Sequence, residues 1–148
     1  MIRPFSFSDL DQILQIERQS FPKSPYDWTT FINLHWLYPE TFWVYTDAES
    51  GREENQMVAY LIFSRDGHII SIAVHPLHRR RGIGKKLLEK AIDDYHLKKL
   101  WAEVRRSNEG AQTFYLRMGF QIIGGVPNYY GNEDALIVQW TSPARRRH

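Results

Sequence analysis

Residues 72–88 read Ile-Ala-Val-His-Pro-Leu-His-Arg-Arg-Arg-Gly-Ile-Gly-Lys-Lys-Leu-Leu, and this stretch decides the fold. The apolar and β-branched residues at its start are typical of a strand, which Pro76 ends. A basic turn with Gly82 and Gly84 follows, and the apolar residues after it recur with the spacing of a helix. A strand, a glycine turn and a helix in this order form one unit of an α/β fold.

The glycine turn is suited to hold a phosphate group. Glycines let the backbone approach a ligand closely, and the first N–H groups of a helix have no partner within it. The helix dipole favours an anion there, as do four nearby cations: Arg79, Arg80, Arg81 and Lys85. The dinucleotide fingerprint needs a glycine where Leu87 stands, and the Walker A loop needs one at Arg79, so neither fits. An ordinary basic surface turn is the alternative.

The rest of the chain adds hairpins before this unit and another strand–helix–strand passage after it. Strands are predicted at 2–5, 41–46, 57–64, 68–74, 100–105, 120–123 and 135–140. Helices are predicted after the caps Ser8 and Asp27, at 84–97 and at 108–118. This order favours an α/β fold with a mixed sheet. Without a repeat or linker, residues 1–148 are expected to form one domain, with an exposed turn at 47–56 and a disordered basic tail at 142–148.

Composition excludes several classes of protein. With 148 residues, 43% of them hydrophobic and no long apolar run, the chain is neither disordered nor membrane-spanning, and we expect a soluble, cytoplasmic protein. A net charge of +2 does not favour nucleic acid, so neither DNA nor a membrane is an expected partner; a monomer is compatible with the sequence. Cysteine is absent, which excludes disulfides and a cysteine nucleophile. His75 and His78 have no further ligand nearby in sequence, so no metal is expected.

Four stretches together resemble the GNAT superfamily of N-acetyltransferases. They are Arg79-x-x-Gly82-x-Gly84 after a strand and His-Pro, LWAEVRRSN at 100–108, QTFYLRMGF at 112–120, and Asn128-Tyr-Tyr130 before Glu133-Asp-Ala135. The last resembles the ribosomal-protein alanine N-acetyltransferases and related protein N-terminal acetyltransferases. The match covers nearly the whole chain in the right order. It implies a mixed, mostly antiparallel sheet of about seven strands with about four helices, splayed where acetyl-CoA binds.

The resemblance also implies how acetyl-CoA, the co-substrate, is held. The main chains of Ile72 and Val74 would pair with pantetheine, and the Val74 N–H would polarise the thioester carbonyl. The expected cofactor-binding residues are Ile72, Ala73, Val74, Arg79, Arg80, Arg81, Gly82, Ile83, Gly84, Lys85, Asn108 and Tyr115. Core packing of Ile72 and Val74, and helix capping by Asn108, are compatible with the same residues.

Two residues are candidates for the chemistry. Glu103 would take the proton of the attacking amine, through a water, and Tyr115 would protonate the departing thiolate. The alternatives are that Glu103 pairs with Arg105 on the same strand face and that Tyr115 packs beside Phe114. Because the chain has no cysteine for an acetyl-enzyme, direct attack within a ternary complex is the simpler route.

The acceptor is expected between two aromatic loops. The resemblance places Phe21, Pro22 and Tyr26 on one side of a peptide entrance and Tyr129 and Tyr130 on the other; the alternative is that these aromatics only anchor the loops. An α-amine has a pKa of about 8 against about 10.4 for lysine, so it loses its proton more readily. The N-terminal amine of a protein, such as a ribosomal protein, is therefore the favoured acceptor. A small amine (a polyamine, amino sugar or amino acid) and a non-catalytic acyl-CoA-binding module are the alternatives.

Overall fold

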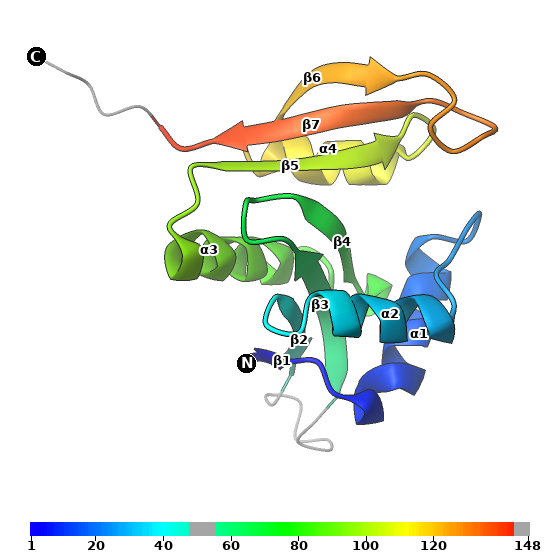
Figure 1. The fold of residues 1–148 in the computed structure, drawn as a ribbon, viewed down its shortest axis with the longest axis vertical. Coiled ribbons are helices and arrows are strands. Elements are labelled where there is room, and N and C mark those ends of the chain that lie inside the picture. Colours follow the sequence, from blue (N-terminus) through cyan, green and yellow to red (C-terminus); the bar gives the residue numbers. More distant parts are fainter. Residues whose placement is uncertain (48–55, 144–148) are drawn as a thin grey trace, which may run out of the picture.

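Two antiparallel sheets form the frame of the computed structural model, which describes residues 1–47 and 56–143 (Figure 1). The first sheet has the strand order β1-β2-β3-β4, with β1 at Ile2–Pro4, β2 at Phe42–Thr46, β3 at Met57–Phe63 and β4 at Ile69–Val74. The second has the order β5-β7-β6, with β5 at Lys99–Arg105, β6 at Gln121–Val126 and β7 at Ala135–Thr141. The strands predicted from residue patterns are all present, with ends that differ by up to three residues.

Four α-helices cover the first sheet and the underside of the second. They are α1 at Leu10–Ser20, α2 at Trp28–Leu37, α3 at Ile83–Tyr95 and α4 at Glu109–Arg117, with short 3₁₀ helices η1 at Phe7–Asp9 and η2 at Pro76–His78. Asp27 caps α2 as predicted, since its carboxylate accepts the Thr30 N–H at 2.9 Å. The prediction for Ser8 is wrong: Ser6 precedes η1, and the Asp9 carboxylate accepts the Ser6 N–H at 2.9 Å.

The two sheets meet at one point and then diverge. In the described ranges, the only sheet-type pairing between them is an isolated parallel bridge from His68 to Trp101, where the Trp101 N–H also donates to the Gly67 carbonyl at 3.0 Å. Beyond it, β4 and β5 run apart (Figure 1). The predicted mixed, mostly antiparallel sheet that splays between these strands is confirmed.

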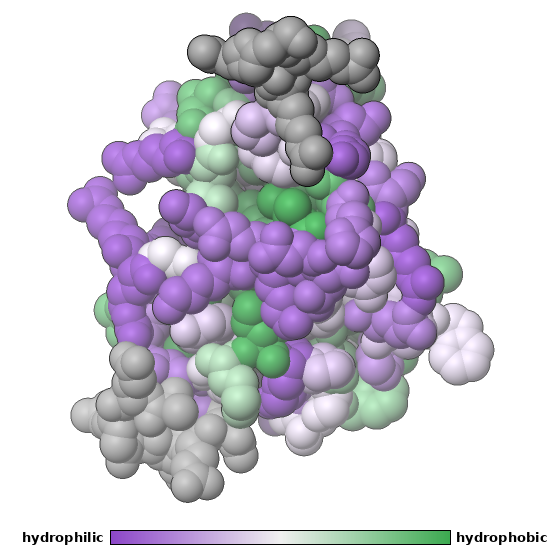
Figure 2. All heavy atoms as spheres, turned by 90° about the vertical axis from the view of Figure 1, so that its left-hand side faces the viewer, coloured by the Kyte–Doolittle hydropathy of each residue, from purple (hydrophilic) through white to green (hydrophobic). Residues whose placement is uncertain are grey.

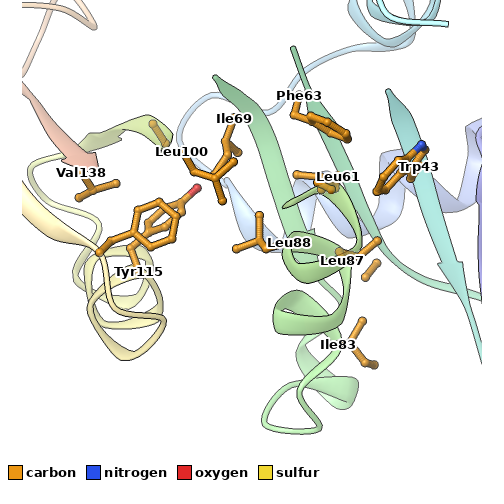
Figure 3. Packing of buried hydrophobic residues seen from close by; sticks show 14 of the residues in the cluster. Trp43, Leu61, Phe63, Ile69, Ile83, Leu87, Leu88, Leu100, Tyr115 and Val138 are labelled. Carbon is orange, nitrogen blue, oxygen red and sulfur yellow. The ribbon is translucent and has the colours of Figure 1, made fainter. Parts of the chain in front are cut away.

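Two hydrophobic cores hold the layers together. The larger core lies between α3, α4 and the strands, and Leu87, Leu88 and Leu100 are buried in it (Figure 3). The smaller core joins α1 and α2 to the opposite face of the first sheet around Phe31, Phe42 and Tyr60. Packing is less complete between α3 and the second sheet, where a cavity of about 220 Å³ is bordered by Leu88, Ile92, Leu100, Phe120, Trp140 and their neighbours. Figure 2 shows apolar residues at the surface between bands of hydrophilic ones on one side of the molecule.

Two predicted exposed segments need correction. Asp47 opens the expected turn at 47–56 but is only 5% exposed, because its carboxylate pairs with Arg81 at 3.0 Å; residues 48–55 lie outside the described residues. In the expected tail at 142–148, the Ser142 N–H donates to the Lys98 carbonyl at 2.8 Å, which continues the pairing of β5 and β7 by one more hydrogen bond. Residues 144–148 are not described. Among the helices described, none is long and apolar enough to cross a membrane.

Candidate active site

The glycine turn presents the start of α3 without a side-chain cap. Gly82 occupies the cap position with a φ of +73°, a left-handed conformation that glycine adopts without strain. Arg80 also has a positive φ, at +65°. Because Gly82 offers no side-chain oxygen, the first N–H groups of α3 remain free of a side-chain cap, and an anion can take that place.

Gly84 has a packing reason that sequence reasoning did not foresee. It is buried, and a Cβ added there would lie 2.7 and 2.8 Å from two ring carbons of Phe114. Glycine therefore lets α3 approach α4. The close approach of Gly84 to a ligand stays a prediction.

The edge of β4 that faces the splay carries main-chain groups that do not pair with β3. The His75 N–H donates to the Val58 carbonyl at 2.7 Å, so this pair is hydrogen-bonded across β3 and β4. Antiparallel pairs alternate, so Val74 opposite Ala59, and Ile72 opposite Leu61, point their N–H and C=O groups away from β3. These are the two residues that the sequence selected for pantetheine. Ala73 and Ile83 are buried, so their side chains are not available to a ligand.

Most of the basic side chains near the turn already have protein partners. Arg79 donates through Nε to the Val74 carbonyl at 3.0 Å, and Arg81 pairs with Asp47. Lys85 lies 3.8 Å from Glu89 on the exposed face of α3, and Arg80 is exposed. The positive charge is therefore concentrated at the turn as predicted, but part of it holds the turn to the sheet.

Glu103 pairs with a histidine and not with Arg105. Its Oε2 lies 2.7 Å from Nε2 of His68, whose ring stacks on Trp101 with centroids 5.2 Å apart. Arg105 pairs instead with Glu133 at 2.8 Å, which overturns the alternative that it neutralises Glu103. Sequence reasoning missed His68, because the contact depends on the bridge between β4 and β5, two strands 25 or more residues apart.

Tyr115 is buried among the residues that join the two sheets. Its side chain reaches toward Ile69 and Leu100 (Figure 3), with the rings of Phe114 and Phe120 at centroid distances of 5.2 and 5.0 Å. In the described part of the chain the Tyr115 hydroxyl makes no hydrogen bond. Its oxygen is not completely buried, so it is not an unsatisfied buried polar atom. Burial raises the pKa of this hydroxyl, with smaller contributions from Tyr130 and Glu103, so its proton is retained at neutral pH.

Asn108 is the cap of α4. Its Oδ1 accepts the Ala111 N–H at 3.0 Å, which confirms the capping role. The side-chain NH₂ group is left over for a ligand at the same helix end. The two expected roles of Asn108 therefore use different atoms.

The tyrosines predicted for the acceptor all feel the charge of Glu103. Burial is the largest cause of a raised pKa in Tyr26, Tyr129 and Tyr130, and the Glu103 charge adds to each rise. The pKa of Tyr130 is raised to about 12. The two loops therefore bring three phenols within electrostatic reach of one carboxylate. Phe21 and Tyr26 also pack on the smaller core, and Pro22 is exposed.

A buried carboxylate anchors the first of these loops. Glu17 is 2% exposed, and it accepts the Tyr26 N–H at 2.9 Å and a short hydrogen bond from the Tyr60 hydroxyl. The Tyr60 hydroxyl also lies 2.7 Å from Ser71 Oγ on β4. Burial raises the pKa of Glu17. The network fixes the backbone of Tyr26 to α1, β3 and β4.

The histidines of η2 have local partners. His75 accepts the Leu77 N–H through Nδ1 at 3.1 Å, and His78 Nδ1 lies 2.9 Å from an Arg81 nitrogen. Burial lowers the pKa of His75. No cluster of three or more metal-ligating side chains occurs within residues 1–47 and 56–143.

Known proteins share both the sequence pattern and this architecture. Residues 10–120 match the family model described as the acetyltransferase (GNAT) family. An uncharacterized N-acetyltransferase of Methanocaldococcus jannaschii is 38% identical over 147 residues, which cover 93% of this chain and 89% of that protein. An N-alpha-acetyltransferase of Sulfolobus acidocaldarius is 31% identical over 157 residues, with the same coverage of both chains. The crystal structure of the ribosomal-protein-S18-alanine N-acetyltransferase from Escherichia coli has a TM-score of 0.73 and 27% identity, covering 100% of this chain and 97% of that one. This chain belongs to the GNAT family of N-acetyltransferases.

Proposed function

We propose that this acetyltransferase modifies the N-terminal α-amine of a protein or peptide, by direct attack on acetyl-CoA in a ternary complex. The observation that carries the proposal is the position of the Glu103–His68 pair, beside the open edge of β4 and among three tyrosines of two loops. One catalytic domain spanning residues 1–148 then holds both substrates on opposite sides of the splay.

The free edge of β4 supports the placement of acetyl-CoA. The outward N–H and C=O groups of Ile72 and the outward N–H of Val74 can pair with the amides of pantetheine, while the Val74 carbonyl accepts a hydrogen bond from Arg79. The uncapped start of α3 with Arg80 and Lys85 suits the pyrophosphate. The Val74 N–H is then available to the thioester oxygen, where negative charge develops during attack.

The proton transfers can be assigned to side chains. As the amine nitrogen bonds to the acetyl carbon and the carbon–sulfur bond breaks, Glu103 takes the amine proton, directly or through a water. With its proton on Nε2, His68 donates to Glu103, orients the carboxylate and leaves Nδ1 as an acceptor. The thiolate leaves with a proton from the Tyr115 hydroxyl, which has no competing partner among the described residues.

Two considerations support an α-amine as the acceptor: the ease with which it loses its proton, and the tyrosines of the two loops. An α-amine with a pKa of about 8 is partly neutral at pH 7, whereas a lysine amine at about 10.4 is almost fully charged. Tyrosines at a peptide entrance supply apolar area and a hydroxyl for backbone groups. The names of the Sulfolobus relative and the E. coli neighbour favour the same acceptor class, and an N-terminal alanine of a ribosomal protein is the first candidate.

The test is thiol release from acetyl-CoA with a panel of amines. The panel holds peptides that begin with alanine, serine or methionine, the same peptides with blocked N-termini, and a polyamine, an amino sugar and free amino acids. We expect turnover only with free peptide N-termini, and loss of it in Glu103→Gln. Turnover of small amines alone would establish the small-molecule alternative, and CoA binding without any turnover would establish a binding module.

A further inference from the structure

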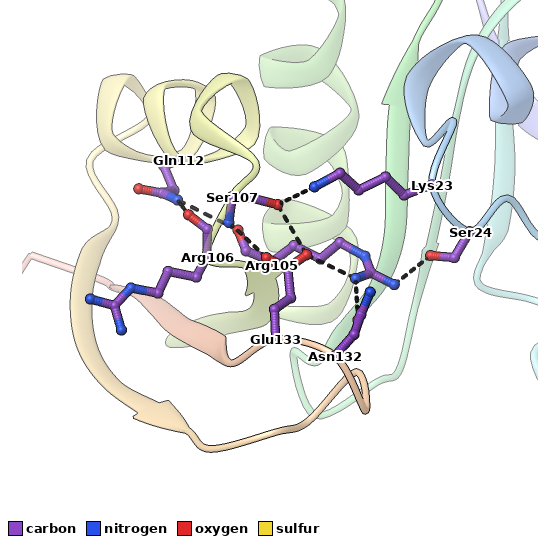
Figure 4. A network of polar contacts seen from close by, with 8 residues as sticks. All are labelled: Lys23, Ser24, Arg105, Arg106, Ser107, Gln112, Asn132 and Glu133. Atoms are coloured by element: carbon purple, nitrogen blue, oxygen red, sulfur yellow. Dashed lines mark hydrogen bonds and ion pairs between the residues drawn. The ribbon is translucent and has the colours of Figure 1, made fainter.

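The last residue of β5, Arg105, connects the two loops that border the proposed acceptor site (Figure 4). Its Nη2 donates to Ser24 Oγ at 2.7 Å in the loop between α1 and α2. Its Nη1 donates at 2.8 Å to Glu133, in the loop between β6 and β7, and at 3.3 Å to Asn132. The guanidinium also lies over the Tyr130 ring, 4.1 Å from the centroid. One planar group therefore contacts both sides of the entrance.

A second chain of hydrogen bonds runs beside the first. Lys23 donates to Ser107 Oγ at 2.9 Å, and Ser107 donates to Glu133 through its hydroxyl at 3.0 Å and its N–H at 3.1 Å. Arg105 and then Ser107 lower the pKa of the Glu133 carboxyl, so Glu133 stays ionised at neutral pH. The two chains join at this one carboxylate, as the dashed lines in Figure 4 show.

Partial burial distinguishes the pair of Arg105 and Glu133 from an ordinary surface pair, whereas the hydrogen bond of Arg105 to Ser24 is exposed. The side chains of Arg105 and Glu133 are 16% and 18% exposed, whereas the neighbouring pair of Arg106 and Asp134 is 72% and 40% exposed with 3.7 Å between the groups. A guanidinium holds several acceptors in a fixed plane, so it determines distances and angles together. A lysine at this position would supply only a point charge.

We propose that Arg105 is a positioning residue that fixes the separation of the two loops and thereby sets acceptor selectivity. The entrance then admits a chain end, which extends in one direction only, and excludes a lysine within a chain, which brings peptide on both sides. This inference rests on the proposed function, because it needs a peptide acceptor. It adds the residues that set the width of the entrance: Arg105 with Ser24 on one side and Glu133 on the other.

The experiment measures selectivity and not activity alone. One peptide with a free N-terminus and an internal lysine, and its N-terminally blocked form, are acetylated by wild type, Arg105→Gln, Arg105→Lys and Ser24→Ala, and the modified site is located by mass spectrometry. For Arg105→Gln we expect a KM for peptide raised about tenfold, equivalent to about 1.4 kcal/mol. The KM for acetyl-CoA should stay within about twofold, and the ratio of lysine to N-terminal acetylation should rise. Arg105→Lys should fall between wild type and Arg105→Gln.

Ser24→Ala keeps the ion pair and removes only the contact of Arg105 with the first loop, which Lys23 and Tyr26 still hold, so it should raise the same ratio by a smaller factor. Arg106→Gln removes the adjacent exposed charge and serves as the matched control, with constants like those of wild type. An unchanged ratio in both Arg105→Gln and Ser24→Ala would overturn the inference, as would equal rises in both KM values. If wild type acetylates no peptide, the proposed function fails and this inference fails with it. If wild type is selective for the N-terminus and the variants are equally selective, only this inference is refuted.

Discussion

Replacement of Gly84 by alanine separates two reasons for a glycine at the start of α3. The added methyl group would lie 2.7 and 2.8 Å from the Cε1 and Cζ atoms of Phe114, whereas the next neighbour, a methyl of Val74, is at an ordinary 3.8 Å. The contact is therefore with one ring edge on α4, and the methyl group points toward this ring. It does not point along the main-chain N–H groups that are proposed to meet the pyrophosphate.

The expected loss of stability is the difference between two opposing effects. Alanine in a helix is favoured over glycine by about 1 kcal/mol. Overpacking of a tight core contact costs about 1–3 kcal/mol, and here the neighbour is the outer end of a ring that can shift. Gly84→Ala should therefore lower the free energy of unfolding by about 1 kcal/mol, which corresponds to a Tm lower by about 2–4 °C.

A double variant tests the cause. In Gly84→Ala/Phe114→Leu the ring edge is gone, so the loss in free energy of unfolding should be smaller than the sum of the losses in the two single variants. Urea unfolding of wild type, both single variants and the double variant measures these losses. CoA affinity, measured by calorimetry, should fall in Gly84→Ala because α4 is displaced, and should recover in the double variant. Strict additivity would refute the packing argument. Affinity that stays low in the double variant would show that Gly84 acts by backbone approach to the ligand.

Three further predictions concern the chemistry. Tyr115→Phe removes a hydroxyl that has no hydrogen-bond partner among the described residues, so thermal unfolding should be unchanged or slightly raised in Tm while kcat falls by about 10²-fold or more; a wild-type kcat would remove Tyr115 as the acid. His68→Ala should lower kcat and alter the pH–rate profile, as is expected of Glu103→Gln, and the two changes together should be less than additive because the groups form one pair; additive losses would mean that His68 acts elsewhere. Burial raises the pKa of Glu17 above its ordinary 4.5, so its contribution to stability is complete below that value and is lost as pH rises through the raised pKa. Between pH 4 and pH 7 the free energy of unfolding should therefore fall less in Glu17→Gln than in wild type. Parallel plots of this free energy against pH would show that the pKa of Glu17 is not raised.

The elements that were predicted correctly are those that local patterns determine. Apolar runs such as residues 57–63 and the helical spacing after Gly82 need no knowledge of distant contacts. Register and partners are non-local. Glu103 could be recognised as a carboxylate within a strand, but its partner His68 could not, because the contact depends on the parallel bridge from His68 to Trp101, which joins segments distant in sequence. The incorrect pairing of Arg105 has the same origin. Spacing along the strand suggested Glu103 as its partner, but Arg105 pairs with Glu133 of a loop.

Burial of charge marks the other limit of sequence reading. Asp47 and Glu17 stand in polar and amphipathic patterns that are typical of exposed positions, yet both are at most 5% exposed because each has a specific partner. A buried carboxylate without partners would cost several kcal/mol, so such residues indicate where the chain is held in a defined geometry. Here they hold the glycine turn and the Tyr26 loop, the two segments proposed to meet acetyl-CoA and the acceptor.

The same argument changes what the basic residues are expected to do. Arg79 donates a hydrogen bond to the Val74 carbonyl and Arg81 donates one to Asp47, so both arginines hold the turn in place before any ligand binds. The affinity for a pyrophosphate should then depend mainly on the N–H groups at the start of α3, with Arg80 and Lys85 as the more accessible charges. Binding through oriented backbone groups is screened less by salt than attraction between exposed charges. We therefore expect CoA affinity to depend only weakly on ionic strength. A steep dependence would show that the arginine charges, and not the backbone N–H groups, contribute most of the affinity.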